Sequence, residues 1–324
     1  MTEAGLRGLG DESAQRQRQM SPLDRAMALW YDRPCNDTPA DQLWNRKEAM
    51  TTSSNARFSL GVSLHMLDPQ QGLDAIKILG GSSVRAVELW EPAFTRDKEY
   101  VQEARRALAV AGVEPRTVHA SFGASLDISS ADAATRSAGI QAIDVALDLA
   151  ARMGAGMVIV HPSSEPIESE ARDARMAQAK RSIEIIAHMA QQAGCRVALE
   201  LLPRTCLGRS AAELLRLLED VDPATAGACL DTNHLMGRFA SLPELVRSLG
   251  PRLLALHCSD YDGVDEKHWL PMRGVIDWSA FLSALSAIGF TGPLHYEATL
   301  DGQTPAERLE SLEANYVQLV TMMP

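Results

Sequence analysis

The sequence predicts an α/β protein folded as a single (β/α)8 barrel, a TIM barrel, with a poorly structured N-terminal extension. The first observation is a rhythm: from Arg57 onward, apolar segments alternate with amphipathic ones at spacings of roughly 30 residues, the length of one βα unit. The second is number, since eight such units fit into the last ~270 residues, as in barrels of this class. The third is how the apolar runs end. The run Leu253–Leu256 passes directly into His257 and a series of carboxylates and imidazoles, as a buried parallel strand does at a polar mouth.

Each expected strand is an apolar run bounded by polar or glycine-containing segments. The eight runs cover 57–67, 84–90, 116–122, 157–163, 196–203, 226–234, 253–260 and 292–299. An open, doubly wound sheet would need a glycine-rich phosphate turn after its first strand. The segment GVSLHMLDPQQG at 61–72 contains no such turn, which favours the closed barrel.

The expected helices are bounded by capping residues and by glycines. Their predicted starts and caps are Gln70, Thr95, Ser130, the capping boxes Ser210–Glu213 and Ser241–Glu244, Asp277 and Pro305. Their predicted ends are Leu79, Gly112, Gly154, Gly194 and Gly289. In the last helix, an inward-facing stripe recurs at helical spacing: Leu309, Leu312, Tyr316 and Leu319.

The chain is expected to divide at about residue 55. Residues 1–20 are polar and aperiodic, which is typical of flexible tails. We therefore predict a flexible N-terminal extension at 1–54 and the barrel at 55–324.

The composition is that of a soluble globular protein, with 324 residues, 46% hydrophobic and 23% charged. The net charge of −11 disfavours a nucleic-acid partner, which would want a basic patch. The five cysteines are odd in number and form no CxxC, so we expect a reducing, cytoplasmic location. No apolar run is long enough to span a membrane, and the first residues lack the apolar segment of a signal peptide.

Titratable side chains stand at the ends of six of the expected strands. They are His119, His161, Glu200, Asp231, His234, His257, Asp260 and Glu297, and His268 follows in the loop after the seventh strand. A single histidine at a strand end is usually a hydrogen-bonded structural residue. Several imidazoles and carboxylates in one cavity are costly unless they are paired or bind a metal. The joint pattern therefore predicts a metal centre at the barrel mouth.

The ligand types indicate which ion this centre would take. Glu200, Asp231, His257 and Glu297 provide three carboxylates and one imidazole, with no thiolate. This mixture suits one divalent ion with open positions, and we expect Mn²⁺, with Mg²⁺, Co²⁺ or Zn²⁺ as alternatives. Among the cysteines, we expect Cys229 in the core, Cys258 pointing outward, and Cys206 in the mouth loop within reach of substrate.

Several motifs carry a resemblance to a known family. They are ELLPR with Glu200, CLDTNH with Asp231 and His234, HCSD with His257, the segment HWLPMRGVIDW, and HYEAT with Glu297. Over residues 57–324, the chain resembles the xylose isomerase-like barrel superfamily of sugar phosphate isomerases and epimerases.

The resemblance implies a small sugar-like substrate, with no membrane partner, and leaves a homo-oligomer open. One divalent ion would be held by Glu200, Asp231, His257 and Glu297. The two glutamates would be catalytic and would exchange a proton on a carbon next to a carbonyl or hydroxyl. The reaction is then isomerisation or epimerisation of a sugar, sugar phosphate, keto-sugar or cyclitol. The substrate would be contacted by His119, His161, His234, His268, Arg204 and Arg273.

Three departures leave the subfamily open. Ketose 3-epimerases usually carry a second glutamate where this chain has Cys206, and an arginine where it has Gly263. Their GxG after the seventh strand reads Met272, Arg273, Gly274 here.

Two alternatives stand beside this reading. VHASFGASL and VIVHPSS resemble endonuclease IV, a three-zinc phosphodiesterase acting on abasic DNA. That resemblance implies extra metal ligands: His119 and His161 with Glu200, and His234 with Glu266 and His268. Against it, Leu201 replaces the nuclease's asparagine, the loop after the seventh strand is shorter, and the chain is acidic. The other alternative is a related dehydratase or a non-catalytic sugar-binding barrel.

Overall fold

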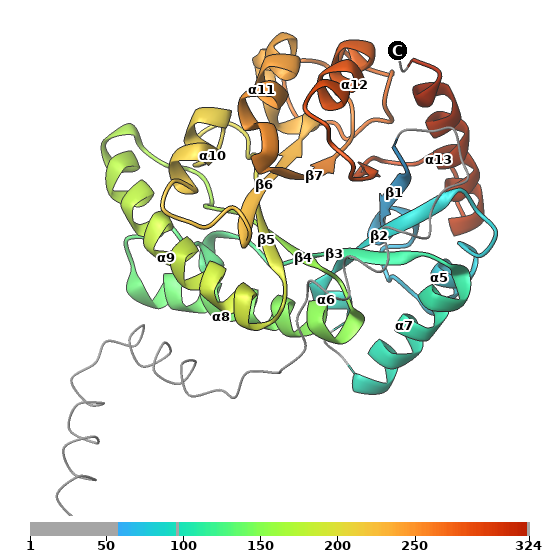
Figure 1. Ribbon diagram of the computed structural model, residues 1–324, viewed down its shortest axis with the longest axis horizontal. Helices are drawn as coiled ribbons and strands as arrows, with labels where there is room; N and C mark the ends of the chain where they lie inside the picture. Colours follow the sequence, from blue (N-terminus) through green and yellow to red (C-terminus); the bar gives the residue numbers. More distant parts are fainter. Residues whose placement is uncertain (1–57, 95–96, 323–324) are drawn as a thin grey trace, which may run out of the picture.

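The computed structural model describes residues 58–94 and 97–322, and these form a TIM barrel (Figure 1). The strands are β1 (Leu60–Ser63), β2 (Val84–Trp90), β3 (Glu114–His119), β4 (Met157–Val160), β5 (Arg196–Glu200), β6 (Ala226–Asp231), β7 (Leu253–His257) and β8 (Leu294–Tyr296). They are parallel and pair in the order β7-β6-β5-β4-β3-β2-β1-β8. The predicted fold is confirmed, while the predicted extension at 1–54 lies outside the described residues.

The barrel closes just beyond the end of β7. Cys258 and Tyr296 form an isolated parallel bridge between β7 and β8. The Cys258 amide donates to the His295 carbonyl at 2.7 Å, and the Glu297 amide donates to the Cys258 carbonyl at 3.2 Å. This closure brings the segments after β7 and β8 side by side at the mouth.

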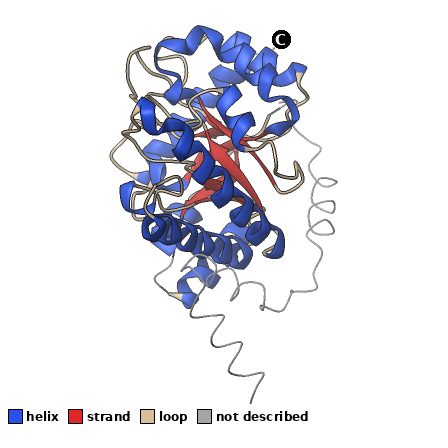
Figure 2. Cartoon of the chain, turned by 90° about the vertical axis from the view of Figure 1, so that its left-hand side faces the viewer, coloured by secondary structure: helices blue, strands red, loops and turns tan. Residues whose placement is uncertain are grey.

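Helices surround the strands in Figure 1, and the turned view in Figure 2 shows helices above and below them. The α-helices are α4 (Leu64–Leu67), α5 (Leu73–Lys77), α6 (Glu91–Phe94), α7 (Lys98–Ala111), α8 (Ala133–Met153), α9 (Arg172–Gln192), α10 (Ala211–Leu217), α11 (Leu242–Leu249), α12 (Trp278–Ala287) and α13 (Pro305–Val320). Short 3-10 helices are η2 (Ala124–Leu126), η3 (Ser169–Ala171), η4 (Thr232–Ser241) and η5 (Gly250–Arg252). None of the described helices combines the length and apolar character that crossing a bilayer requires.

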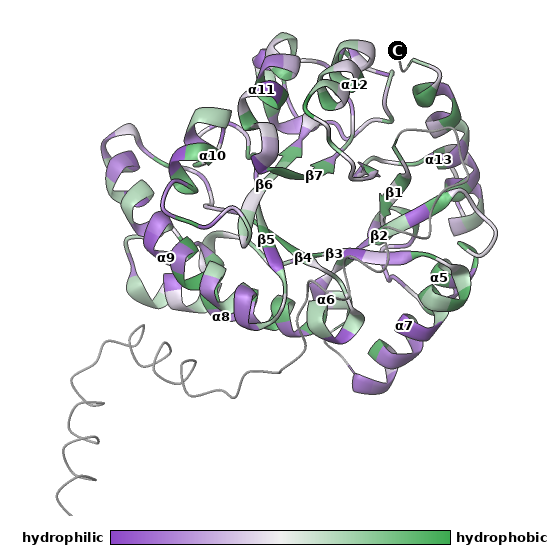
Figure 3. Cartoon of the chain, in the orientation of Figure 1, coloured by the Kyte–Doolittle hydropathy of each residue, from purple (hydrophilic) through white to green (hydrophobic). Residues whose placement is uncertain are grey.

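The core has two layers, because successive side chains of a strand point to opposite faces. The larger layer lies between strands and helices, where α13 buries its predicted stripe and where Cys258 lies, pointing outward as predicted. Hydrophilic residues colour parts of the outer helices in Figure 3, whereas β6 and β7 are largely hydrophobic. A small second cluster is formed by Met157, Ile159, Ala198 and Cys229. It confirms Cys229 as a core residue. Cys206, expected in the mouth loop, is buried, with 5% of its surface exposed.

The first βα unit differs from its prediction. The expected strand 57–67 ends at Ser63, and Leu64–Leu67 turns into α4, which buries Leu64 and Leu67. The helix expected from Gln70 begins after Gly72 and spans only Leu73–Lys77. Since a short apolar run fits a strand or a buried helix equally well, the pattern alone could not locate this boundary.

Two of the predicted caps are also corrected. Asp97 caps α7 by accepting from the Glu99 amide, and Thr95 lies outside the described residues. The capping box at Ser241 is wrong, because η4 runs directly into α11 and the Ser241 hydroxyl donates back to the Arg238 carbonyl.

Two other helix starts use threonine or serine caps. Ser210 accepts from the Glu213 amide at 3.3 Å, but the Glu213 carboxylate pairs with Arg172 instead of completing a box. A complete capping box, missed in the sequence, joins Thr304 and Glu307 at the start of α13.

Gly274 allows the loop after β7 to fold back tightly on its own start. A Cβ atom there would lie 2.0 Å from the Tyr261 carbonyl oxygen and 2.3 Å from Asp260 Oδ1. We expect Gly274→Ala to lower the free energy of unfolding by about 3 kcal/mol, because backbone must move to admit the methyl group. Gly237→Ala is the control, since a Cβ there meets no described residue within 4 Å, and it should change stability by less than about 0.5 kcal/mol. Urea denaturation of both variants checks this, and equal stabilities would contradict the tight packing at Gly274.

Candidate active site

The predicted strand-end residues gather at one end of the barrel. His119, Glu200, Asp231 and His257 are the last residues of β3, β5, β6 and β7. His161 and Glu297 directly follow β4 and β8. Because the strands are parallel, their carboxyl ends open at the same mouth. The first four of these side chains are buried, and Glu297 and His161 are half-buried.

Four of them form a central cluster at the mouth. One ligand atom each of Glu200, Asp231, His257 and Glu297 lies within 4.8 Å of all the others. The imidazole is at the centre: His257 Nδ1 is 2.7 Å from Glu297 Oε2, 3.2 Å from Glu200 Oε1 and 4.0 Å from Asp231 Oδ2. The structure therefore brings together the four residues predicted as ligands of one ion.

The chemistry of this cluster fits a divalent cation. Asp231 Oδ2 is buried and has no hydrogen-bond partner among the residues that the structure describes, and a buried carboxylate oxygen without a partner is costly. Burial raises the pKa of Asp231, and the charges of Glu200 and Glu297 add to the effect, so that it reaches about 6 despite the attraction of His234. Three carboxylates that repel one another around an unsatisfied oxygen favour a positive ion among them.

Glu200 also joins a second group of ligand atoms. Its Oε2 lies 3.2 Å from His119 Nε2 and 2.9 Å from His161 Nε2. His119 donates its other ring proton, on Nδ1, to the Ala120 carbonyl at 2.9 Å. Burial alone would lower the pKa of His119, but the hydrogen bond and charge of Glu200 raise it to about 9. Burial dominates at His161 and lowers its pKa.

A third group lies on the other side of the cluster. It comprises His234, Glu266 and His268, whose ligand atoms also lie within 4.8 Å of one another. His234 donates from Nδ1 to the Leu201 carbonyl at 2.8 Å, which leaves Nε2 facing Glu266. His268 has a φ of 49° and donates from Nδ1 to the Glu297 carbonyl at 3.1 Å. The histidines predicted at the mouth are thus all placed there.

The cations of the mouth loops, among them Arg204 and Arg273 predicted to contact substrate, are paired with carboxylates of the loops. Arg204 contacts Glu165 and Asp265 at 2.8 Å and Glu266 at 2.7 Å. Arg273 pairs with Asp301, and Lys267 lies 3.3 Å from Asp262. Arg204 therefore ties together the loops after β4, β5 and β7, and a substrate would have to compete with these pairs.

Asp260 does not join the cluster, although it follows the same strand as His257. It is fully buried and accepts from the Tyr261 and Ile276 amides and, at 2.8 Å, from the indole of Trp278. Its position anchors the loop after β7 to α12.

Sequence reasoning missed one buried carboxylate beneath the cluster. Glu88 lies on β2, is 2% exposed, and accepts a hydrogen bond from His257 Nε2 at 3.2 Å. The sequence signal was the glutamate inside the apolar run VRAVELW, because a charged residue is rarely buried unless it is paired.

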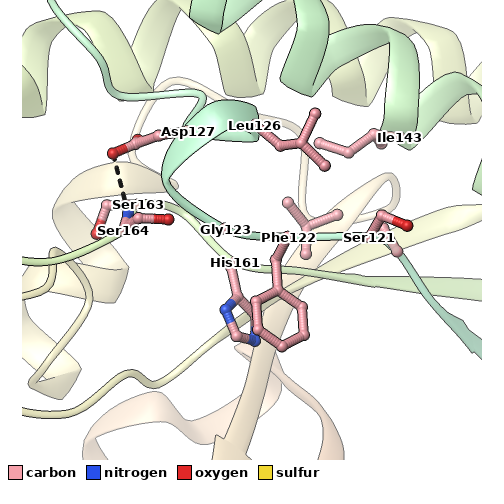
Figure 4. A pocket seen from close by; sticks show the side chains of 11 residues that line it. Ser121, Phe122, Gly123, Leu126, Asp127, Ile143, His161, Ser163 and Ser164 are labelled. Atoms are coloured by element: carbon pink, nitrogen blue, oxygen red, sulfur yellow. Dashed lines mark hydrogen bonds between the residues drawn. The ribbon is translucent and has the colours of Figure 1, made fainter.

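Aromatic side chains line the side of the mouth next to His161. Phe122 is 44% exposed and stacks on the His161 ring, with centroids 3.9 Å apart. Both border a small pocket with Ser163 and Ser164, and the Ser164 amide donates to Asp127 at 3.1 Å (Figure 4). Of these residues Phe122 is the exposed one, whereas Ser163 is buried and accepts from the Leu207 amide at 2.8 Å. An exposed aromatic face beside the cluster suits a ligand with an apolar face.

Comparison with known proteins places this mouth in context. Residues 73–316 match the family model of the xylose isomerase-like TIM barrel. An uncharacterized protein of Sinorhizobium fredii is 24% identical over 276 residues, which are 77% of this chain and 85% of that protein. A ketose 3-epimerase of Arthrobacter globiformis is 28% identical over 204 residues, 61% of this chain and 68% of that enzyme.

Solved structures show the same architecture. A D-tagatose 3-epimerase-like protein superposes with a TM-score of 0.69 at 22% identity, covering 81% of this chain and 98% of that one. At this identity the likeness concerns the fold.

Proposed function

Since the chain belongs to the family of xylose isomerase-like TIM barrels, we propose that it is a divalent-metal-dependent sugar isomerase or epimerase. The observation that carries this proposal is the convergence of Glu200 and Glu297 on one candidate cation site from β5 and from the segment after β8. The similarity to a ketose 3-epimerase supports it. The substrate would be a keto-sugar, a sugar phosphate or a cyclitol, and the ion Mn²⁺ in a cytoplasmic enzyme.

The chain's own residues provide what proton transfer next to a carbonyl requires. A cation held by Glu200, Asp231, His257 and Glu297 would polarise a substrate oxygen and stabilise the negative charge that develops there. One glutamate removes the proton from the adjacent carbon as general base. The other, on the opposite side of that carbon, returns a proton to the other face. Burial of Glu200, Asp231 and His257 strengthens their electrostatic interactions.

The mouth would orient the substrate through groups outside the central cluster. His234 and His268 each donate from Nδ1 to a backbone carbonyl, so their Nε2 atoms would be the ones to contact hydroxyl oxygens. His119 and His161 direct Nε2 toward Glu200 and would contact a substrate only by sharing or leaving that carboxylate. The exposed face of Phe122 can take the apolar face of a sugar ring. Arg204 and Arg273 would contribute only after leaving their carboxylate partners.

Incubation of candidate substrates in deuterated water with Mn²⁺ tests the proposal. Free sugars, sugar phosphates, keto-sugars and inosose-like cyclitols would be followed by NMR. We expect deuterium to enter at one carbon of one substrate class, which would identify the carbon acid. A dehydratase would give a product lighter by one water, and a binding barrel would show ligand-induced thermal stabilisation without exchange. Absence of exchange across the whole panel would count against the proposal.

One observation favours a second candidate, a multi-metal phosphodiesterase. The three groups of ligand atoms, two of which share Glu200, would suit three ions. Against it, the Arg204 guanidinium lies 2.7 Å from Glu266, so the third group already has a cation beside it. Metal analysis separates the two: about one ion per chain supports the isomerase, whereas about three ions and cleavage of abasic DNA support the nuclease.

A further inference from the structure

Glu88 forms a buried network inside the barrel, below the central cluster. Its Oε1 accepts from the Ser63 hydroxyl at 2.7 Å, and its Oε2 accepts from the Thr117 hydroxyl at 2.8 Å and from His257 Nε2 at 3.2 Å. Strand register creates this arrangement, because Ser63 pairs with Glu88 across β1 and β2, and Glu88 pairs with Thr117 across β2 and β3. Three adjacent strands therefore present one level of polar side chains to the interior.

This network fixes the orientation of the His257 ring. A carboxylate can only accept, so His257 donates its Nε2 proton to Glu88. Nδ1 is then the ring atom that faces Glu200 and Glu297, at 3.2 and 2.7 Å. A proton on Nδ1 would have to leave before a cation could bind there, whereas the Nε2 proton is held by Glu88.

The buried negative charge of Glu88 needs a positive charge nearby. Within 58–94 and 97–322, this carboxylate forms an ion pair with His257, and both side chains are almost fully buried. His119 and His295 also act on the Glu88 charge, but all of these groups are imidazoles, and a buried carboxylate balanced by imidazoles is costly to keep in the core. Its cost is offset if the imidazole binds a cation on its other side, since metal-ligating histidines commonly donate their second ring proton to a carboxylate.

We propose that Glu88 is a positioning residue for the metal centre, which holds His257 in the tautomer and orientation that bind a divalent cation through Nδ1. This inference rests on the proposed function, because it requires the cation. Glu88 acts through His257 and is separated from the mouth by it.

Glu88→Gln is the central test, because glutamine keeps the shape and one acceptor oxygen but removes the charge. We expect the Kd for Mn²⁺, measured by calorimetric titration of the metal-stripped protein, to weaken by about 10- to 100-fold. The Tm of the stripped protein should stay within about 3 °C, since a group that only supported the core would instead change the Tm and leave the Kd unchanged. Glu91→Gln is the matched control, because Glu91 is also buried, directly follows β2 and accepts a hydrogen bond from the Ser121 hydroxyl. The Kd of this variant for Mn²⁺ should differ from that of the wild type by less than about threefold.

A second variant keeps the inference testable if Glu88→Gln does not fold. Thr117→Val removes one hydrogen bond to Glu88 Oε2 at nearly constant volume, and should weaken the Kd for Mn²⁺ by about 3- to 10-fold. An unchanged Kd in the folded variants would overturn the role of Glu88 while leaving the proposed function intact. The wild-type chain could also bind Mn²⁺ tightly and exchange no proton. That result would overturn the proposed reaction only, and the Kd of the variants for Mn²⁺ would still decide the role of Glu88.

Discussion

Glu297→Gln is expected to reduce solvent proton exchange by about 10³-fold or more while the barrel remains folded, and Glu200→Gln is expected to do the same. An amide cannot take a proton from carbon, so either variant lacks one half of the transfer. The fold should survive because both side chains lie at the mouth, beyond the strand–helix layer that carries most of the core.

The two variants should differ in metal affinity. Glu200 contacts His119 and His161 as well as His257, so its charge supports two groups of ligand atoms. In the part of the chain that the structure describes, the Glu297 carboxylate forms one ion pair, with His257 at 2.7 Å. We therefore expect Glu200→Gln to lose bound metal along with activity, and Glu297→Gln to retain more of it.

Deuterium exchange, metal content and circular dichroism measured on the same preparations check both effects. Glu91→Gln is the control, since it removes a buried carboxylate near the mouth without touching the cluster. Exchange at more than a tenth of the wild-type rate in metal-loaded Glu297→Gln would count against a scheme with two proton carriers.

The sequence contains the pattern that places the cluster. Each of Glu200, Asp231 and His257 ends an apolar run, and in a parallel barrel this position alone puts a side chain at the mouth. No knowledge of loop conformation is needed for this step. Prediction was therefore strongest where strand periodicity and chain direction determine the geometry.

Glu88 could not be assigned in the same way. Its partner His257 is 169 residues away, and their contact depends on the barrel's closure and on the register of β1, β2 and β3. A local pattern shows only that a charge lies within an apolar strand. The same holds for Arg204, whose three carboxylate partners come from two other loops.

Helix starts show a different limit. Ser241–Glu244 and Thr304–Glu307 have the same spacing and residue types, yet only the second forms a capping box. The difference lies in the preceding chain: η4 is already helical before Ser241, whereas Thr304 is extended, with ψ of 155°. A cap requires the extended conformation, which the spacing does not reveal.

Removal of the divalent ion is expected to have the other large effect. Chelation should abolish proton exchange and lower the Tm by about 10 °C, and added Mn²⁺ should restore both. Glu200, Asp231 and Glu297 place carboxylate oxygens within 4.8 Å of one another, and within 58–94 and 97–322 Asp231 Oδ2 finds no hydrogen-bond partner. A ligand present at about 1,000 times its Kd stabilises the folded chain by about 4 kcal/mol, which corresponds to this shift in a domain of about 250 residues.

Asp231→Asn separates the bound ion from general effects of the chelator. The variant loses one ligand charge and relieves the repulsion that raises the pKa of Asp231 to about 6. Its Tm should therefore respond weakly to chelation, whereas the wild type responds strongly, and the Tm of the stripped variant should match or exceed that of the stripped wild type. The stripped wild type could instead keep its Tm and its exchange activity at a metal content below about one ion per ten chains. The four side chains would then converge for a reason other than binding a cation. In that case the surrounding histidines alone must stabilise the buried carboxylates.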